Sequence, residues 1–256
     1  MILKVLIDKI VNLPLIKRIY PSLLRILNIK TQKKVNNFYL NLELKNSIDR
    51  EIYVKGIYEN LQIKFLIEQA NQIKFDHFFD IGSYLGYYSF FLEKNTNIKN
   101  IYAFEANPVN YNKLFSNKKL NSSNVNIYNF GCSSKNEKSK IWFTDSNKQG
   151  GSSVFSTKDK ELNKYKNSKI LFHDINLIKL DDKFKINKEY ILAKIDVERH
   201  ELEVLKGATD LLLKNNFCLM QIEIFDDKKD EIFNFLNNFK FKLINNIDKD
   251  YYFKNY

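Results

Sequence analysis

The chain has 256 residues, of which 44% are hydrophobic and 14% aromatic, and its formal net charge is +11. This composition excludes a disordered chain, and the length suffices for one large α/β domain with its own core. The lysines are mixed with acids along the whole chain, so the charge favours a solvated basic surface, and we expect no nucleic-acid partner. Cys132 and Cys218 lack metal-type spacing and no apolar run is long enough to span a bilayer, so we expect a cytoplasmic protein with free thiols and no metal centre.

The first 30 residues alternate apolar side chains with Lys and Arg at helical spacing, and Pro14 and Pro21 divide them into short pieces. Proline interrupts a helix interior but is tolerated in a first turn, so the pattern predicts short amphipathic helices. A basic amphipathic helix can lie on an anionic membrane surface, and it can equally pack on its own domain or on a second subunit. Peripheral membrane contact through residues 1–30 and a homodimer are therefore both hypotheses for this segment.

Two further patterns complete an N-terminal extension, which we place at residues 1–72. Alternating apolar residues from Phe38 to Leu44, and then Ile48, Ile52 and Val54, predict a small hairpin over residues 31–56. Residues 58–71 have the apolar spacing of a helix.

Residues 73–256 predict a second unit in which strands and helices alternate, the pattern of a mostly parallel sheet covered by helices on both faces. Strands are expected near residues 76–81, 100–105, 125–130, 190–196 and 217–224, and helices near 86–94, 108–120, 200–214 and 227–238. A strand near 140–144 and a long polar loop over 145–168 separate the third and fourth of these strands. The last residues predict a C-terminal antiparallel hairpin, which a purely parallel nucleotide-binding fold does not require.

The stretch FFDIGSYLGYYS, residues 78–89, predicts a buried strand that turns over glycines into a helix. Such a turn presents main-chain N–H groups and a helix N-terminus to a bound cofactor. The second strand ends in AFEANP and places Glu105 25 positions after Asp80, where a carboxylate can accept hydrogen bonds from both hydroxyls of a ribose. Together the two motifs predict a nucleotide-cofactor site.

Two cofactors compete for this turn, a dinucleotide such as NAD and S-adenosylmethionine. A pyrophosphate requires a turn free of anions and a third glycine for close packing, whereas this chain has Asp80 before the turn and Ser89 at the third-glycine position. An aspartate suits a ligand that carries an ammonium and a sulfonium group. The turn therefore favours S-adenosylmethionine.

Two later strands bring further acids to the same edge of the predicted sheet. The strand ILAKID ends at Asp196 and is followed by Glu198 and His200, and the strand FCLMQIE ends at Glu223. Ligands of open α/β sheets bind at the carboxyl ends of the strands, so we predict Asp196, His200 and Glu223 as catalytic residues. Asp196 or His200 could accept a proton from a hydroxyl, or Asp196 and Glu223 could bind Mg²⁺ that orients it.

The ordered set DIGSYLGYYS, AFEANP, GGSS, KLDD, KIDVERHELEVLKGA and QIE resembles the FkbM-type S-adenosylmethionine-dependent methyltransferases over about residues 75–226. The resemblance implies a class I methyltransferase fold, Rossmann-like, with a seven-stranded sheet and a C-terminal antiparallel hairpin. It also implies O-methylation of a sugar, glycan or related small-molecule hydroxyl. The predicted cofactor-binding residues are Asp80, Gly82, Ser83, Gly86, Glu105, Ala106 and Asp196.

The chain departs from the family pattern at two places. Ser83 and Tyr84 replace the usual Ala-Asn, and Arg199 stands where the family has the glycine of Asp-Val-Glu-Gly. If that position requires a positive φ, an arginine strains the turn. The alternative hypothesis is a catalytically altered relative that binds a membrane or a nucleic acid. Against a base-modifying enzyme, the fourth strand ends in IDVE and has no Asn/Asp-Pro-Pro-aromatic signature.

Overall fold

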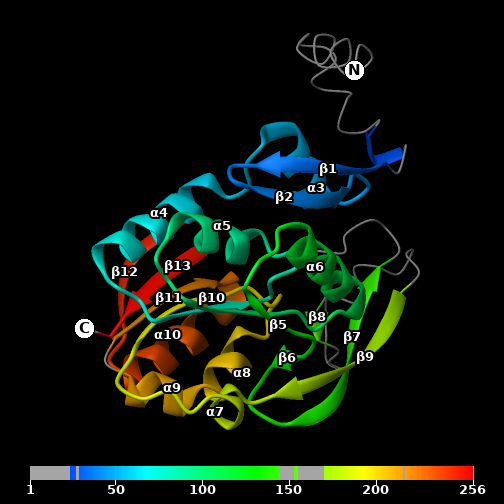
Figure 1. Cartoon of the computed structure of the whole chain (residues 1–256). Coiled ribbons are helices and arrows are strands. Elements are labelled where there is room, and N and C mark those ends of the chain that lie inside the picture. Colours follow the sequence, from blue (N-terminus) through cyan, green and yellow to red (C-terminus); the bar gives the residue numbers. More distant parts are fainter. Residues whose placement is uncertain (1–23, 27–28, 145–152, 155–169, 216, 256) are drawn as a thin grey trace.

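The computed structural model describes residues 24–26, 29–144, 153–154, 170–215 and 217–255 (Figure 1). The predictions for residues 1–23 and for nearly all of the loop 145–168, including the glycine pair of GGSS, lie outside these ranges. Leu24, the first described residue, is buried in the main core. None of the described helices is both long and apolar enough to cross a bilayer.

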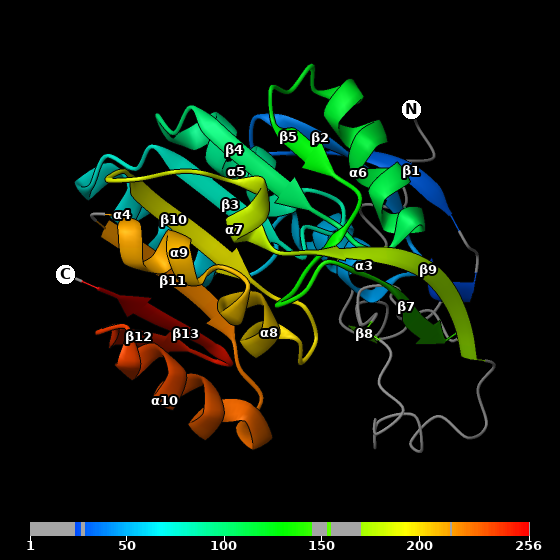
Figure 2. The same cartoon turned by 90° about the horizontal axis from the view of Figure 1, so that it is seen from below.

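A seven-stranded sheet forms the centre of the fold, in the order β12-β13-β11-β10-β3-β4-β5 (Figures 1 and 2). Its strands are β3 (His77–Ile81), β4 (Asn100–Phe104), β5 (Asn126–Tyr128), β10 (Tyr190–Ile195), β11 (Phe217–Glu223), β12 (Lys242–Ile247) and β13 (Asp250–Lys254). The five strands from β11 to β5 are parallel, and β13 pairs antiparallel with β11 and with β12. The predicted fold class, a mostly parallel sheet with a C-terminal antiparallel hairpin, is confirmed.

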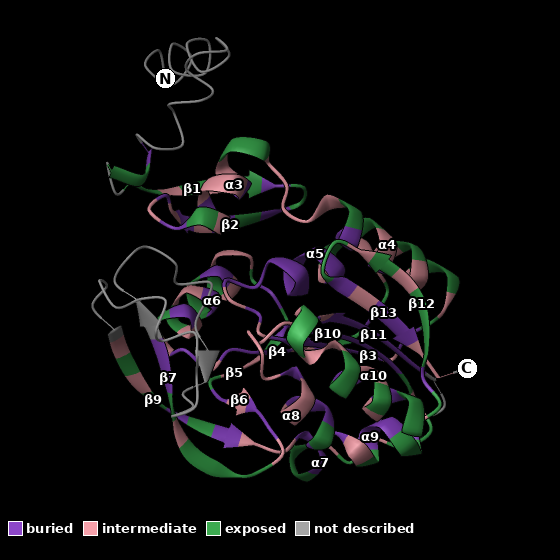
Figure 3. Ribbon diagram, turned by 180° about the vertical axis from the view of Figure 1, so that it is seen from behind, coloured by how far each residue is buried: buried purple, intermediate pink, exposed green. Residues whose placement is uncertain are grey.

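Helices cover both faces of this sheet, and neighbouring strand residues face opposite layers. Phe78 packs in one cluster with the helices α4 (Asn60–Gln72), α5 (Tyr87–Asn95) and α6 (Pro108–Leu120). Phe79 packs in a second cluster with α8 (Glu201–Lys206), α9 (Thr209–Lys214) and α10 (Lys229–Asn238). The short helices α7 (Leu180–Lys183) and η2 (Asp226–Lys228) complete the set. Because the central strands are buried on both faces, they are apolar almost without interruption (Figure 3).

The N-terminal hairpin is shorter than predicted. It consists of β1 (Lys30–Val35) and β2 (Phe38–Glu43), and the second apolar stretch forms a helix, α3 (Ser47–Lys55). Ile48 and Ile52 lie four residues apart, which places them on one helix face, and Gly56 ends the helix at φ 75°. β2 packs on the sheet domain, where Phe38 contacts Phe90 of α5 at 6.1 Å between ring centroids. The extension and the sheet therefore share one core.

One other expectation is corrected, and the strand expected near 140–144 is confirmed as part of β7 (Glu137–Thr144). The helix predicted over 200–214 is two helices that are separated at Gly207, where a Cβ would lie 1.9 Å from the carbonyl oxygen of Ser133. A second, four-stranded sheet was not predicted. It has the order β6-β9-β7-β8 and consists of β6 (Gly131–Cys132), β7 (Glu137–Thr144), β8 (Ser153–Val154) and β9 (Ile170–Ile178).

Candidate active site

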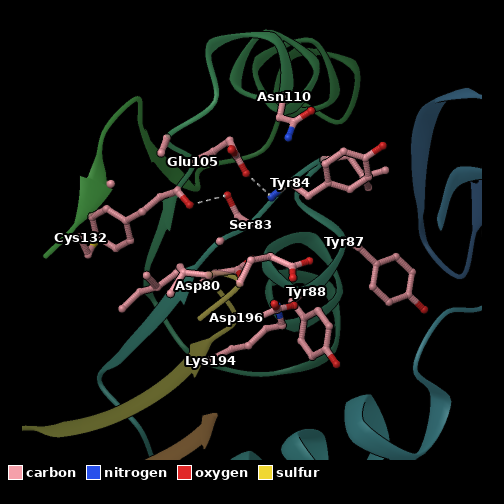
Figure 4. A pocket seen from close by; sticks show the side chains of 18 of the residues that line it. Asp80, Ser83, Tyr84, Tyr87, Tyr88, Glu105, Asn110, Cys132, Lys194 and Asp196 are labelled. Carbon is pink, nitrogen blue, oxygen red and sulfur yellow. Dashed lines mark hydrogen bonds and ion pairs between the residues drawn. The ribbon is translucent and has the colours of Figure 1, made fainter. Parts of the chain in front are cut away.

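The carboxyl ends of β3, β4 and β10 surround a cavity with about 910 Å³ of empty space, part of it open to solvent (Figure 4). Most of the predicted site residues line it, namely Asp80, Gly82, Ser83, Glu105, Ala106, Asp196, Glu198 and His200. Gly86 and Glu223 are not among the lining residues. The structure thus brings together residues from three motifs that are up to 120 positions apart in the chain.

Asp80 is the last residue but one of the fully buried strand β3 and is 1% exposed. One carboxylate oxygen, Oδ2, accepts hydrogen bonds from the main-chain N–H of Ser89 at 3.1 Å and from its hydroxyl at 2.6 Å. The other oxygen, Oδ1, is buried and has no hydrogen-bond partner among the described residues. Burial raises the pKa of Asp80, although the charge of Lys194 and the Ser89 hydrogen bonds oppose this. A buried acceptor of this kind is completed by a ligand or water that donates a hydrogen bond.

Both glycines of the turn have positive φ, 85° at Gly82 and 87° at Gly86. At Gly82 a Cβ would lie 1.8 Å from the carbonyl oxygen of Asp196, so only glycine lets the two strand ends approach. At Gly86, which precedes α5, a Cβ would meet Phe90 and Leu114. Gly86 thus packs the new helix closely, while Gly82 shapes the wall of the cavity.

Glu105 holds the turn in place from the end of β4. Its Oε2 accepts from the main-chain N–H of Tyr84 at 2.9 Å, and its Oε1 accepts from the N–H of Asn107 at 2.8 Å. Burial raises the pKa of Glu105 to about 7. Asn107 itself caps α6, with its side chain accepting from the N–H of Val109. The carboxylate lines the cavity at the end of the second strand, as the ribose hypothesis requires.

Tyr84 is accommodated by the N-terminal extension (Figure 4). Its φ is 50°, and its hydroxyl donates to Oδ1 of Asp49 on α3 at 2.7 Å. Lys113 of α6 contacts the other Asp49 oxygen at 3.0 Å and lies 5.1 Å from the Tyr84 ring centroid. The tyrosine therefore ties the predicted cofactor turn to α3 and α6.

Lys194 was missed by the sequence analysis. It lies on β10, is only 4% exposed, and its Nζ contacts Oδ2 of Asp196 at 2.9 Å. The ammonium also lies 4.9 Å from the Tyr88 ring centroid. Burial alone would lower the pKa of Lys194, but the carboxylates of Asp196, Asp80 and Glu59 raise it overall, so the side chain stays charged. A lysine inside an otherwise apolar strand, two residues before an aspartate, is the signal that could have found it.

The loop after Asp196 is unusual in its backbone, because Glu198 and Arg199 both have positive φ, at 52° and 78°. Glu201 stabilises the loop, since its Oε1 accepts from the main-chain N–H groups of Val197 at 3.1 Å and Arg199 at 3.0 Å. The Arg199 guanidinium pairs with Asp227 and lies 4.5 Å from the Phe225 ring centroid. The residue that replaces the family glycine thus occupies the left-handed conformation and has partners of its own. Glu201 has a structural role.

His200 lies at the cavity, before the first turn of α8, and its Nε2 is 3.0 Å from the Ser133 hydroxyl. Burial lowers the pKa of His200, so the imidazole is neutral at neutral pH. A neutral imidazole can accept a proton.

Glu223 lies outside this cavity, in an adjoining one. Burial raises the pKa of Glu223, and the negative charges of Asp196 and Glu198 add to the effect. Burial likewise raises the pKa of Glu198, to about 8. Within the part of the chain that the structure describes, no group of three His, Cys, Asp or Glu side chains is arranged to hold a metal ion.

Comparison with known proteins agrees with this arrangement. Residues 80–243 match the model of the methyltransferase FkbM domain, a span that contains the turn, Glu105, Asp196 and Glu223. The chain belongs to the FkbM methyltransferase family. A curated relative, the hexuronic acid methyltransferase AglP of Haloferax volcanii, is 30% identical over 169 residues. That alignment covers 66% of this FkbM chain and 64% of AglP, so the chain matches a little under two thirds of its relative's length.

Solved structures with a similar fold include M. jannaschii TYW2 in complex with AdoMet, at 12% identity and a TM-score of 0.43. That comparison covers 88% of this FkbM chain and 83% of the other. The M. jannaschii tRNA m1G37 methyltransferase is 13% identical with a TM-score of 0.47, covering 88% and 55% of the two chains. Because both TM-scores are below 0.5, the family assignment depends on the match to the FkbM domain model.

Proposed function

We propose that this FkbM family chain is an S-adenosylmethionine-dependent O-methyltransferase that acts on a hydroxyl of a sugar, a glycan or a related small molecule. The observation that carries the proposal is the unpartnered, buried Oδ1 of Asp80 in the wall of the cavity. An ammonium donor at this position would satisfy it, and Lys194 lies in the same cavity as a complement for a carboxylate. The zwitterionic end of S-adenosylmethionine carries both groups.

The remaining lining fits the other half of the cofactor. Glu105 is placed to accept hydrogen bonds from ribose hydroxyls, and Phe104 and Phe130 supply apolar walls. When bound, S-adenosylmethionine supplies a methyl group attached to a sulfonium. The negative charge of Asp80 and Asp196 favours a cation in this cavity.

The chain's own residues then position the acceptor and take up its proton. A methyl transfer is an in-line displacement, so holding donor and acceptor in line provides much of the rate enhancement. His200 is the best-placed proton acceptor, because it lines the cavity and burial lowers its pKa. Asp196 forms an ion pair with Lys194 at 2.9 Å. Its proposed role is therefore to contribute negative charge to the site and not to accept the proton.

Isothermal titration calorimetry with S-adenosylmethionine and S-adenosylhomocysteine tests the cofactor assignment. The wild-type chain should bind both, and Asp80→Asn should bind them at least about tenfold more weakly, the equivalent of one charge-assisted hydrogen bond. Ser123→Ala, which removes a hydroxyl remote from the cavity lining, is the matched control. An absence of binding by the wild-type chain, or binding of NAD in its place, would refute the proposal.

A further inference from the structure

A second cavity adjoins the predicted cofactor site at the connection between α3 and α4. It has about 1010 Å³ of empty space, part of it open to solvent, and it is bounded by residues 57–62, by Glu223 at the end of β11, and by residues 248–250 of the C-terminal hairpin. Tyr58 lines both this groove and the cofactor cavity. Asp196 of the cofactor cavity and Glu223 of the groove follow directly after Ile195 and Ile222, which are paired in the neighbouring strands β10 and β11. A molecule in the groove therefore meets the cofactor cavity at Tyr58.

Tyr58 is fixed as the wall between the two cavities. Its main-chain N–H donates to the Tyr87 hydroxyl at 3.0 Å, and its ring packs edge-on against the Tyr87 ring at 5.9 Å between centroids. The next residue, Glu59, has a φ of 45° and accepts from the Tyr88 hydroxyl at 2.5 Å. A fixed aromatic ring beside polar groups suits a sugar, whose ring offers an apolar C–H face and a rim of hydroxyls.

The charged side chains that line the groove are mostly acidic. Five carboxyl groups line it, whereas the lining lysines are Lys55 and Lys249. The carboxyls belong to Glu51, Glu59, Glu223, Asp248 and Asp250. Lys55 is already paired with Glu51 at 2.7 Å, and Lys249 lies 4.6 Å from the Phe225 ring centroid. Burial, with the charges of Asp196 and Glu198, raises the pKa of Glu223 to about 9, so this carboxyl holds a proton at neutral pH. An acceptor with a carboxylate of its own would add a like charge to the other carboxyls of the lining.

We infer that the groove beside Tyr58 is the acceptor site, and that it takes a sugar without an anionic group and rejects a hexuronate. The inference rests on the proposed methyltransferase function and narrows its substrate class. It differs from what the name of AglP states for that relative, a hexuronic acid. The hydroxyls of a neutral sugar can donate hydrogen bonds to the groove carboxylates, whereas a hexuronate carboxylate cannot.

Saturation-transfer difference NMR on the protein saturated with S-adenosylhomocysteine tests this, with methyl glucoside and methyl glucuronide as the two probes. They differ only in the oxidation state of one carbon, so size and ring shape are matched. We expect the glucoside to bind at least about tenfold more tightly than the glucuronide, a ratio that Asp248→Asn should reduce. Asparagine tolerates the positive φ of 55° at this turn, so the variant should keep its fold.

A blocking variant locates the binding site. Leu61 lines the groove and is 62% exposed, and Leu213 on α9 is 63% exposed and does not line it. Leu61→Trp should weaken glucoside binding about tenfold or more and leave the affinity for S-adenosylhomocysteine unchanged, while Leu213→Trp should change neither. Equal or tighter binding of the glucuronide, equal binding by the two tryptophan variants, or no binding of either sugar would overturn the inference. Sugar binding without cofactor binding would instead refute the proposed function.

Discussion

Removing the hydroxyl of Tyr84 tests whether the N-terminal extension supports the predicted cofactor turn. In Tyr84→Phe the ring stays, but Oδ1 of Asp49 loses a donor at 2.7 Å in a site where Asp49 is fully buried. The carboxylate keeps Lys113 at 3.0 Å and the main-chain N–H of Glu43 at 2.6 Å. A hydrogen bond to a charged group contributes about 1.5–3 kcal/mol, so the free energy of unfolding should fall by about that amount. For a domain of this size the melting temperature should drop by about 3–12 °C.

Urea unfolding followed by circular dichroism measures the effect. Tyr39→Phe, at a 44% exposed tyrosine of β2, is the control and should stay within about 0.5 kcal/mol of the wild type. Lys113→Met should cost more than Tyr84→Phe, about 3–5 kcal/mol, because it leaves the buried Asp49 carboxylate without its cation. If Tyr84→Phe is as stable as the wild type, the hydroxyl does not anchor the turn and our account of this tyrosine is wrong.

Three further predictions concern the site itself. His200→Ala should lower kcat by roughly 10²–10⁴-fold and remove the fall in activity at acidic pH. In the wild type the midpoint of that fall should lie below the usual histidine pKa, because burial lowers the pKa of His200. Glu105→Gln leaves one oxygen, in place of two, to accept from the main-chain N–H groups of Tyr84 and Asn107. This variant should bind S-adenosylmethionine about tenfold or more weakly in calorimetry. An unchanged affinity would count against a role for the carboxylate. The raised pKa of Glu223 makes the folded state hold a proton that the unfolded chain releases, so this contribution to stability is present at low pH and is lost as pH rises. Between about pH 5 and about pH 8, the free energy of unfolding measured in urea should fall by up to about 1.4 kcal/mol per pH unit more in the wild type than in Glu223→Gln. If the two proteins show parallel dependences on pH, this prediction is wrong.

The sheet was predictable from the sequence because its strands are short apolar runs bounded by turns, each followed by a helical pattern. The second sheet was not, because the apolar residues of β9 are interrupted by His173, Asp174 and Asn176 and form no continuous run. The break at Gly207 was also beyond local patterns. An isolated glycine is tolerated in a helix, and what requires a glycine here is the close approach to Ser133, 74 positions earlier in the chain.

The candidate site was predictable where chemistry sits at a strand end, as at Asp80, Glu105 and Asp196. Tyr58 and Glu59 could not be found in this way, because they belong to the extension and reach the cavities only through tertiary packing. The sequence raised a positive φ at Arg199 only as a condition, and the structure has φ at 78° there. The pairing of Arg199 with Asp227 could not be expected, because it joins two loops that follow different strands.

The close approach at Gly82 has a consequence for how such a site can change over time. The turn that would hold the methyl donor and the loop that begins at Asp196 touch through main-chain atoms, with no side chain between them. The separation of the two loops is therefore independent of the side chains that surround them. If the groove is the acceptor site, substitutions along it would alter which acceptor enters, while the backbone keeps the distance between the two loops.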